Sequence, residues 1–149
     1  MSERDPRDGG YRGYIASRPI LGHRTPQHVQ NLVIRNFTSR HGLAYRLSAA
    51  EYAMPGCYLM LEDVLQELEH LDGMIAYSLF MLPRDAARRR AIWHRILDQG
   101  TVFYAAVEEL RLANEADIER LETLIDLRLA TEMHGVTQRE LDVLRSSLP

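Results

Sequence analysis

Short apolar runs alternate with helix-length amphipathic segments in this chain, and this alternation limits the possible folds more than any other feature. Runs suited to strands cover residues 11–16, 43–49, 74–77 and 101–107. Helical segments between them cover residues 26–42, 58–71 and 84–99. This order is typical of right-handed crossovers between parallel strands. We therefore expect an α/β fold, a small four-stranded, mainly parallel sheet with flanking helices, flavodoxin-like in type.

The first helix has the clearest local signals. Thr25 offers a capping hydroxyl and Pro26 suits the first helical position, where its missing N–H is not needed. Val29, Val33 and Phe37 then follow at the spacing of a helix face that packs on a sheet.

The C-terminal part differs in kind. A long helix is expected over residues 114–133, and its apolar positions cover a wider arc than packing on a small sheet requires. We expect a flexible leader over residues 1–10, an α/β domain over 11–112, and C-terminal helices over 113–149 that form a dimer contact. Thr137 to Glu140 has the form of a capping box that opens a last short helix.

Composition limits the kinds of partner that we expect for this chain. The 149 residues carry a net charge of -3, so no overall field attracts nucleic acid, and we expect no nucleic-acid partner. All basic residues are arginine. Cys57 is the only cysteine, which excludes an intramolecular disulfide and favours a reducing, cytoplasmic location. No apolar run is long enough to span a membrane, so we expect no membrane partner. No cofactor or metal motif is present, so we expect no cofactor and no metal.

Chemically active side chains follow each expected strand. Because loops after parallel strands share one edge of a sheet, they should converge there. We expect catalytic roles for Glu51 and Glu108 as proton-transfer groups and for Ser17. Expected substrate-binding residues are Arg18, Gln27, Gln30, Asn31, Tyr52, Tyr77, Ser78, Arg84 and Glu109. Arginine suits an anion, and amides and carboxylates suit hydroxyls, so the pattern indicates an anionic, hydroxyl-rich ligand.

Each of these residues also has a purely structural interpretation. Ser17 can be a turn residue, and Glu108 and Glu109 can cap the segment that follows their strand. The run Arg88 to Arg90 is most simply a solvated helix face, with Arg88 and Arg89 pointing outward.

Two resemblances add to these observations. The first covers residues 11–133 and depends on Gly13-Tyr14-Ile15, Ser17-Arg18-Pro19, Pro26-Gln27, Glu51-Tyr52 and Tyr77-Ser78-Leu79-Phe80. These motifs resemble the sporadic carbohydrate cluster family, which occurs among bacterial genes for surface sugars and has no assigned reaction. The resemblance implies a pathway more than a mechanism.

The second resemblance concerns architecture. A strand that ends in a serine-bearing loop, followed by a late long helix, is similar to the catalytic domain of serine recombinases, a resolvase-like fold. There the serine attacks DNA phosphate among arginines, which implies comparable places for Ser17, Arg18 and Arg84. The chain departs from that pattern at Phe80-Met81, where recombinases have an Asp-Arg pair, and it shows no basic helix-turn-helix domain.

Three functional hypotheses follow. The first is a carbohydrate-biosynthesis enzyme, an isomerase, epimerase or lyase that acts on an anionic sugar derivative by proton transfer. The alternative is a non-catalytic, recombinase-like homodimer that binds a sugar nucleotide or a partner enzyme. The third, a nucleic-acid enzyme with Ser17 as nucleophile, predicts salt-sensitive DNA binding, which we do not expect.

Overall fold

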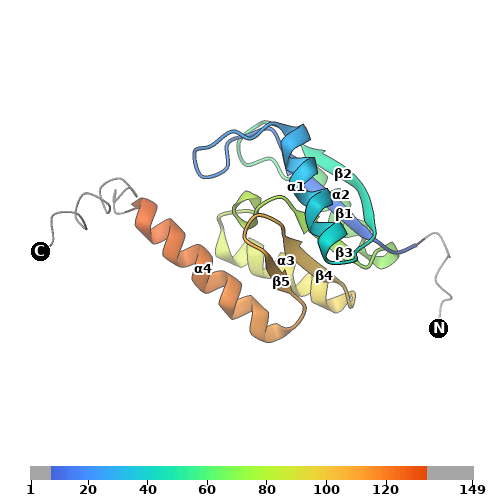
Figure 1. Ribbon diagram of the computed structural model, residues 1–149. Helices are drawn as coiled ribbons and strands as arrows, with labels where there is room; N and C mark the ends of the chain where they lie inside the picture. The colour runs from blue at the N-terminus through green and yellow to red at the C-terminus, as the bar shows by residue number, and fades with distance from the viewer. Residues whose placement is uncertain (1–7, 134–149) are drawn as a thin grey trace, which may run out of the picture.

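The computed structural model describes residues 8–133, which form a five-stranded sheet covered by helices on both faces (Figure 1). In chain order the elements are β1 (Tyr11–Ala16), α1 (Gln27–Arg40), β2 (Tyr45–Glu51), α2 (Leu59–Gln66), η1 (Leu68–His70), β3 (Gly73–Ala76), η2 (Leu79–Met81), α3 (Ala86–Asp98), β4 (Val102–Ala105), β5 (Leu110–Leu112) and α4 (Glu115–Met133). The α/β fold and the long C-terminal helix are confirmed. Residues 1–7 of the expected leader (1–10) and the capping box at 137–140 lie outside the described residues.

The sheet order is β2-β1-β3-β4-β5, and the first four of these strands are parallel. β5 is an addition to the expected four strands and pairs antiparallel with β4. The chain reverses between them at Glu109, whose φ of 53° is a left-handed value. A three-residue strand is too short to give a periodic signal, so the sequence did not predict it.

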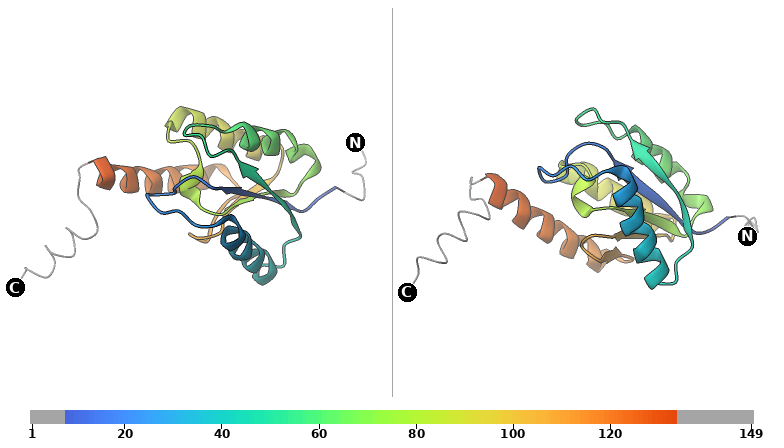
Figure 2. Two further views of the ribbon diagram at one scale, coloured as in Figure 1. Left: turned by 90° about the horizontal axis from the view of Figure 1, so that it is seen from above. Right: turned by 45° about the horizontal axis from the view of Figure 1, so that its top comes forward.

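The helices form two layers. α1 packs on one face of the sheet, and α2, α3 and α4 pack on the other, as the view from above in Figure 2 makes plain. β3 lies at the centre and is buried on both faces: Met74 belongs to the cluster under α2 and α3, and Ile75 to the cluster under α1. Such two-sided burial explains the continuous apolar sequence of β3.

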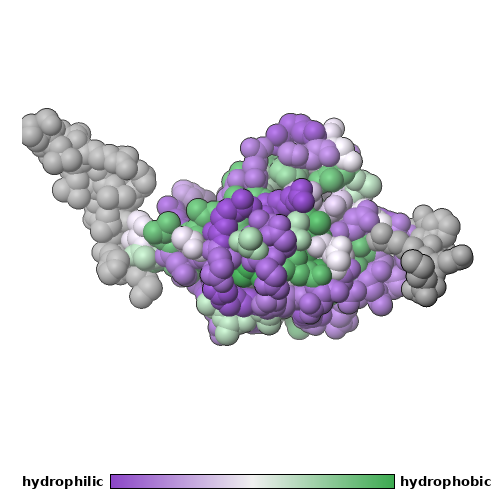
Figure 3. Space-filling model, turned by 90° about the horizontal axis from the view of Figure 1, so that it is seen from below, coloured by the Kyte–Doolittle hydropathy of each residue, from purple (hydrophilic) through white to green (hydrophobic). Residues whose placement is uncertain are grey.

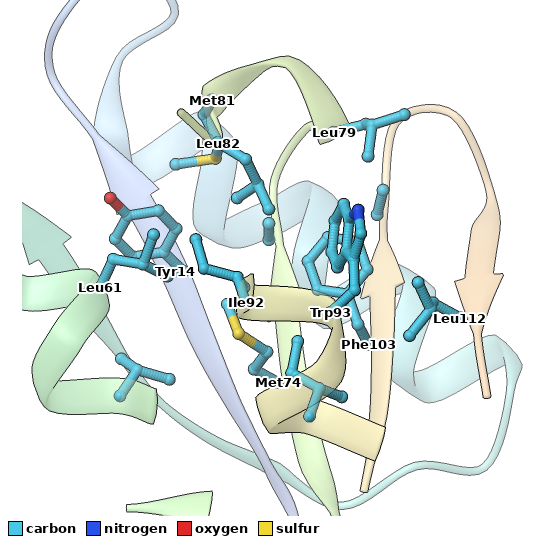
Figure 4. Packing of buried hydrophobic residues seen from close by; sticks show 14 of the residues in the cluster. Tyr14, Leu61, Met74, Leu79, Met81, Leu82, Ile92, Trp93, Phe103 and Leu112 are labelled. Carbon is cyan, nitrogen blue, oxygen red and sulfur yellow. The ribbon is translucent and has the colours of Figure 1, made fainter. Parts of the chain in front are cut away.

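The larger core lies beneath α2, α3 and α4 (Figure 4). Trp93 on α3 and Phe103 on β4 are fully buried, with ring centroids 5.0 Å apart. Tyr14 on β1 is also fully buried and directs its hydroxyl toward the carboxyl end of the strands. Aromatic rings of this size supply much of the apolar area that stabilises the domain.

Two local expectations are wrong. Thr25 does not cap α1, because the helix begins after Pro26 with no side-chain cap. Arg89 does not point outward; it is 1% exposed, and it donates hydrogen bonds to both carboxylate oxygens of Glu122 on α4. α3 therefore turns a different face to the core than expected, because the Arg89 guanidinium pairs with the buried carboxylate of Glu122, 33 residues later in the chain.

No helix within residues 8–133 combines the length and the apolarity needed to cross a membrane. Hydrophilic residues predominate on the face shown in Figure 3, with apolar residues exposed in patches between them.

Candidate functional site

A pocket of about 460 Å³ opens where the loops after β1, β2 and β3 meet the start of α3. We call it the arginine pocket, because its polar lining includes Arg18, Arg84, Arg88 and Arg89 beside Tyr58. Apolar groups from residues 79–82 and from α4 complete the wall. The parallel register of β1, β2 and β3 puts these loops at one edge, as the strand order predicts.

Arg18 comes from the loop after β1 and is partly buried. Its Nη1 donates a 2.6 Å hydrogen bond to the backbone oxygen of Cys57. Its Nη2 is buried and has no hydrogen-bond partner among residues 8–133. A buried guanidinium N–H without an acceptor is costly, so Arg18 keeps one donor that these residues do not satisfy.

Tyr58 lies beside two arginines. The guanidinium of Arg18 is 4.5 Å from its ring centroid, and that of Arg88 on α3 is 4.8 Å from the same centroid. Cation–π contacts hold both arginines in place while leaving their N–H groups able to donate. Two like charges on one ring also raise the local positive potential, which favours an anionic ligand.

The start of α3 is firmly fixed. Asp85 caps it, since its carboxylate accepts hydrogen bonds from the N–H groups of Ala87 and Arg88. Buried Arg89 donates from Nη1 to the backbone oxygens of Pro83 and Arg84. The backbone that carries exposed Arg84 into the pocket is therefore held by a residue whose other donors bind α4.

Glu51 lies at the end of β2, and its side chain is occupied by structural contacts. It is 3% exposed and accepts hydrogen bonds from the Tyr14 hydroxyl at 2.8 Å and from the N–H groups of Tyr52, Met60 and Leu61. Burial and then this carboxylate raise the pKa of Tyr14, so the phenol remains a donor. The carboxylate satisfies N–H groups at the start of α2 and thereby fixes the segment that carries Tyr58.

Glu108 follows β4 and holds the segment after β3. One carboxylate oxygen accepts a 2.5 Å hydrogen bond from the Ser78 hydroxyl, and both oxygens accept from the N–H of Leu79. Its neighbour Glu109 turns away to pair with Arg40 on α1 at 2.9 Å.

Two amides of α1, those of Gln30 and Asn31, form hydrogen bonds with the sheet strands. Buried Gln30 exchanges hydrogen bonds with the backbone N–H and oxygen of Ala16, at 3.1 and 2.6 Å, and so fixes the end of β1. Asn31 accepts hydrogen bonds from Ser48 and Tyr45 on β2. Gln27 is partly buried in the first turn of the same helix.

The residues expected to form one site therefore lie in separate places. Arg18 and Arg84 line the arginine pocket, whereas Tyr77, Ser78 and Glu108 line a second cavity of about 380 Å³. Leu21 and Phe80 line both cavities and lie between the two sets. Ser17 and Tyr52 are exposed in the loops, and neither lines a cavity described here.

Sequence reasoning missed Tyr58 and Arg88. A spacing of four residues from Arg84 would have placed Arg88 on the same side of a helix. Nothing local indicates that Tyr58 meets both Arg18 and Arg88, because these contacts join segments 30 to 40 residues apart in sequence. In the part of the chain that the structure describes, no three His, Cys, Asp or Glu side chains are arranged to hold a metal ion.

Comparison with known proteins gives structural matches only. No protein-family model and no curated protein matches the sequence, so the resemblance to the sporadic carbohydrate cluster family gains no support. A resolvase family site-specific recombinase from Streptococcus pneumoniae matches with a TM-score of 0.59 and 11% identity, over 91% of this chain and 99% of that one. The N-terminal catalytic domain of TP901-1 integrase matches with a TM-score of 0.55 and 15% identity, over 85% and 99%.

These matches correct three expectations. A carbohydrate-biosynthesis enzyme, isomerase or lyase, is contradicted, as are the sugar-derivative partner and the exclusion of nucleic acid, because the matched structures are recombinase and integrase domains. The site gives a physical reason, since the carboxylates of Glu51 and Glu108 are engaged in backbone contacts and the polar lining of the open pocket is mainly guanidinium groups. At these identities the matches establish the fold alone, and that fold is resolvase-like.

Proposed function

We propose that this protein binds nucleic acid and that the arginine pocket takes a backbone phosphate group. The observation that carries the proposal is that Arg18, which lines the pocket, has a buried Nη2 with no acceptor in residues 8–133. A phosphate oxygen would supply that acceptor, and charge-assisted hydrogen bonds of this kind are about twice as strong as neutral ones.

The charges around the pocket support an anionic ligand. Arg84 and Arg88 are exposed at its lining, and Asp85 uses its carboxylate to cap α3. The charge of Arg89 is balanced by Glu122. Arg18 and Arg88 therefore remain to attract an anion locally, although the whole chain carries a net charge of -3.

Nucleic acid is the preferred source of the phosphate because of the fold. The two matched structures are named as a site-specific recombinase and an integrase, and Ser17 follows β1 as the recombinase resemblance implies. Ser17 stays a candidate catalytic residue, as do Glu51 and Glu108, but binding requires none of them. A cytoplasmic location stays a prediction from the sequence.

Fluorescence polarisation with a labelled single-stranded oligonucleotide tests the proposal over about 50 to 200 mM salt. Two phosphate contacts, from Arg18 and Arg88, predict a log–log salt slope of about -1.4, at about 0.7 per charge for single strands. Arg88→Ala should make the slope shallower by about 0.7, and Arg18→Lys should weaken binding because lysine lacks the planar fork.

Arg35→Ala is the matched control, since Arg35 is an exposed arginine on α1, on the other face of the sheet. It should leave affinity and slope unchanged. Absence of binding at the lowest salt, or equal effects of Arg35→Ala and Arg88→Ala, would contradict the proposal.

A further inference from the structure

Starting from the proposed function, we infer that the arginine pocket accommodates one unpaired nucleotide of a strand, with its phosphate against the arginines and its base against apolar side chains, and does not read a continuous duplex. The inference depends on a pocket lining that combines arginine with apolar side chains, on the size of the pocket and on the net charge of the chain.

Contacts bring two arginines of the pocket together. Arg18 and Arg88 both lie over Tyr58, and the loop before Tyr58 contributes Pro55 and Gly56 to the wall. The unpartnered Nη2 belongs to the same Arg18. A phosphate group fits here, because planar guanidinium groups bind its oxygens in pairs.

Other residues that line the pocket are apolar. Ile125 and Leu129 of α4 line the pocket and follow Glu122, whose bonds to Arg89 and Trp93 fix α4 against α3. Half-buried Phe80 and buried Leu82 add to this apolar lining. Apolar side chains with an aromatic ring are what a planar base contacts when it leaves a stack.

Size and charge both disfavour a duplex. A volume of about 460 Å³ lies within the range of about 300–1,000 Å³ for sites that enclose one small ligand. A base in a duplex is paired and stacked, so it can enter such a pocket only after unstacking, which an unpaired base need not do. A duplex would also place many phosphates along a chain whose net charge is -3, where only a few arginines converge.

Three short ligands separate the possibilities: a five-residue oligothymidine, an abasic strand with the same phosphates, and a blunt duplex. The oligothymidine should bind about tenfold more tightly than the abasic strand, because stacking of a base adds affinity that phosphates cannot. Leu129→Ser and Phe80→Ala should reduce that ratio toward one while leaving abasic binding unchanged. Leu32→Ser, at an exposed leucine on α1, is the control and should preserve the ratio.

The outcomes are distinguishable. Binding of all three ligands with equal affinity and with sensitivity to Arg88→Ala would overturn this inference and leave the proposed function intact. Absence of binding to any of the three would overturn both. A tenfold ratio that survives both pocket variants would show that the base contacts another surface, which also overturns the inference.

Discussion

Replacing Glu122 with alanine tests how α4 is attached to the domain. The Glu122 carboxylate accepts three hydrogen bonds, two from Arg89 and one from the Trp93 indole N–H, at 2.8, 2.8 and 3.0 Å. Its side chain and that of Arg89 are 3% and 2% exposed. Truncation leaves a buried guanidinium without its counter-ion, a change that typically costs about 3–5 kcal/mol.

The expected result is a large loss of stability. At about 2–4 °C per kcal/mol for a chain of this size, Glu122→Ala should lower the melting temperature by about 6–20 °C. Urea denaturation followed by circular dichroism measures the free energy of unfolding directly. The double variant Arg89→Met/Glu122→Leu should recover most of that loss, because an apolar pair of similar volume removes the unpaired charge.

Glu119→Ala is the matched control. Glu119 also lies on α4 and pairs with an arginine of α3, Arg90, at 2.7 Å, but both side chains are largely exposed. It should change the melting temperature little, since solvent already screens that pair. Equal effects of Glu119→Ala and Glu122→Ala, or a double variant no more stable than Glu122→Ala, would refute the argument that burial makes this pair important.

Three further predictions concern separate features. Burial alone would raise the pKa of Glu122, but hydrogen bonds from Arg89 and Trp93 lower it overall. The contribution of this carboxylate to the free energy of unfolding is therefore complete above about pH 4.3, the usual pKa of glutamate, and is lost as the pH falls through the lower folded-state pKa. The stability difference between wild type and Glu122→Gln should therefore shrink in acid; a difference that grows would contradict the sign. Gly73→Ala should destabilise by more than about 2 kcal/mol, because the added Cβ would lie 1.8 Å from the backbone oxygen of Val102, and an unchanged melting temperature would contradict this. If the dimer contact expected for residues 113–149 uses exposed Leu124 and Leu127, serine at both positions should halve the mass measured by light scattering, whereas a monomeric wild type would remove that expectation.

Local sequence patterns were sufficient to predict most of the fold. β1 occupies the expected residues 11–16, because a short apolar run between polar segments leaves few alternatives. The strand expected over residues 74–77 left Gly73 outside it. In the structure it opens β3, and its missing side chain lets the backbone of β4 approach.

The site was harder to predict because its residues depend on distant partners. The strand-end rule placed Arg18 and Arg84 at one rim, and both line the arginine pocket. The same rule could not show that Glu51 lies under the start of α2, or that Phe80 and Leu21 divide the rim into two cavities. Arg89 shows the limit most clearly, since only the fold brings it to Glu122.

The short connection between β5 and α4 fixes the rotation of α4 about its axis, and so determines which side chains of α4 line the pocket. Only Ala113 and Asn114 separate these elements, and Asp117 binds back to both through the backbone N–H of Ala113 and the side chain of Asn114. Each residue of a helix turns by about 100°, so deleting one residue from this link would bring Asp126 and Ala130 to the positions of Ile125 and Leu129 at the wall. Selectivity for the apolar half of a ligand could therefore be altered by changing the length of the link, with every arginine left in place.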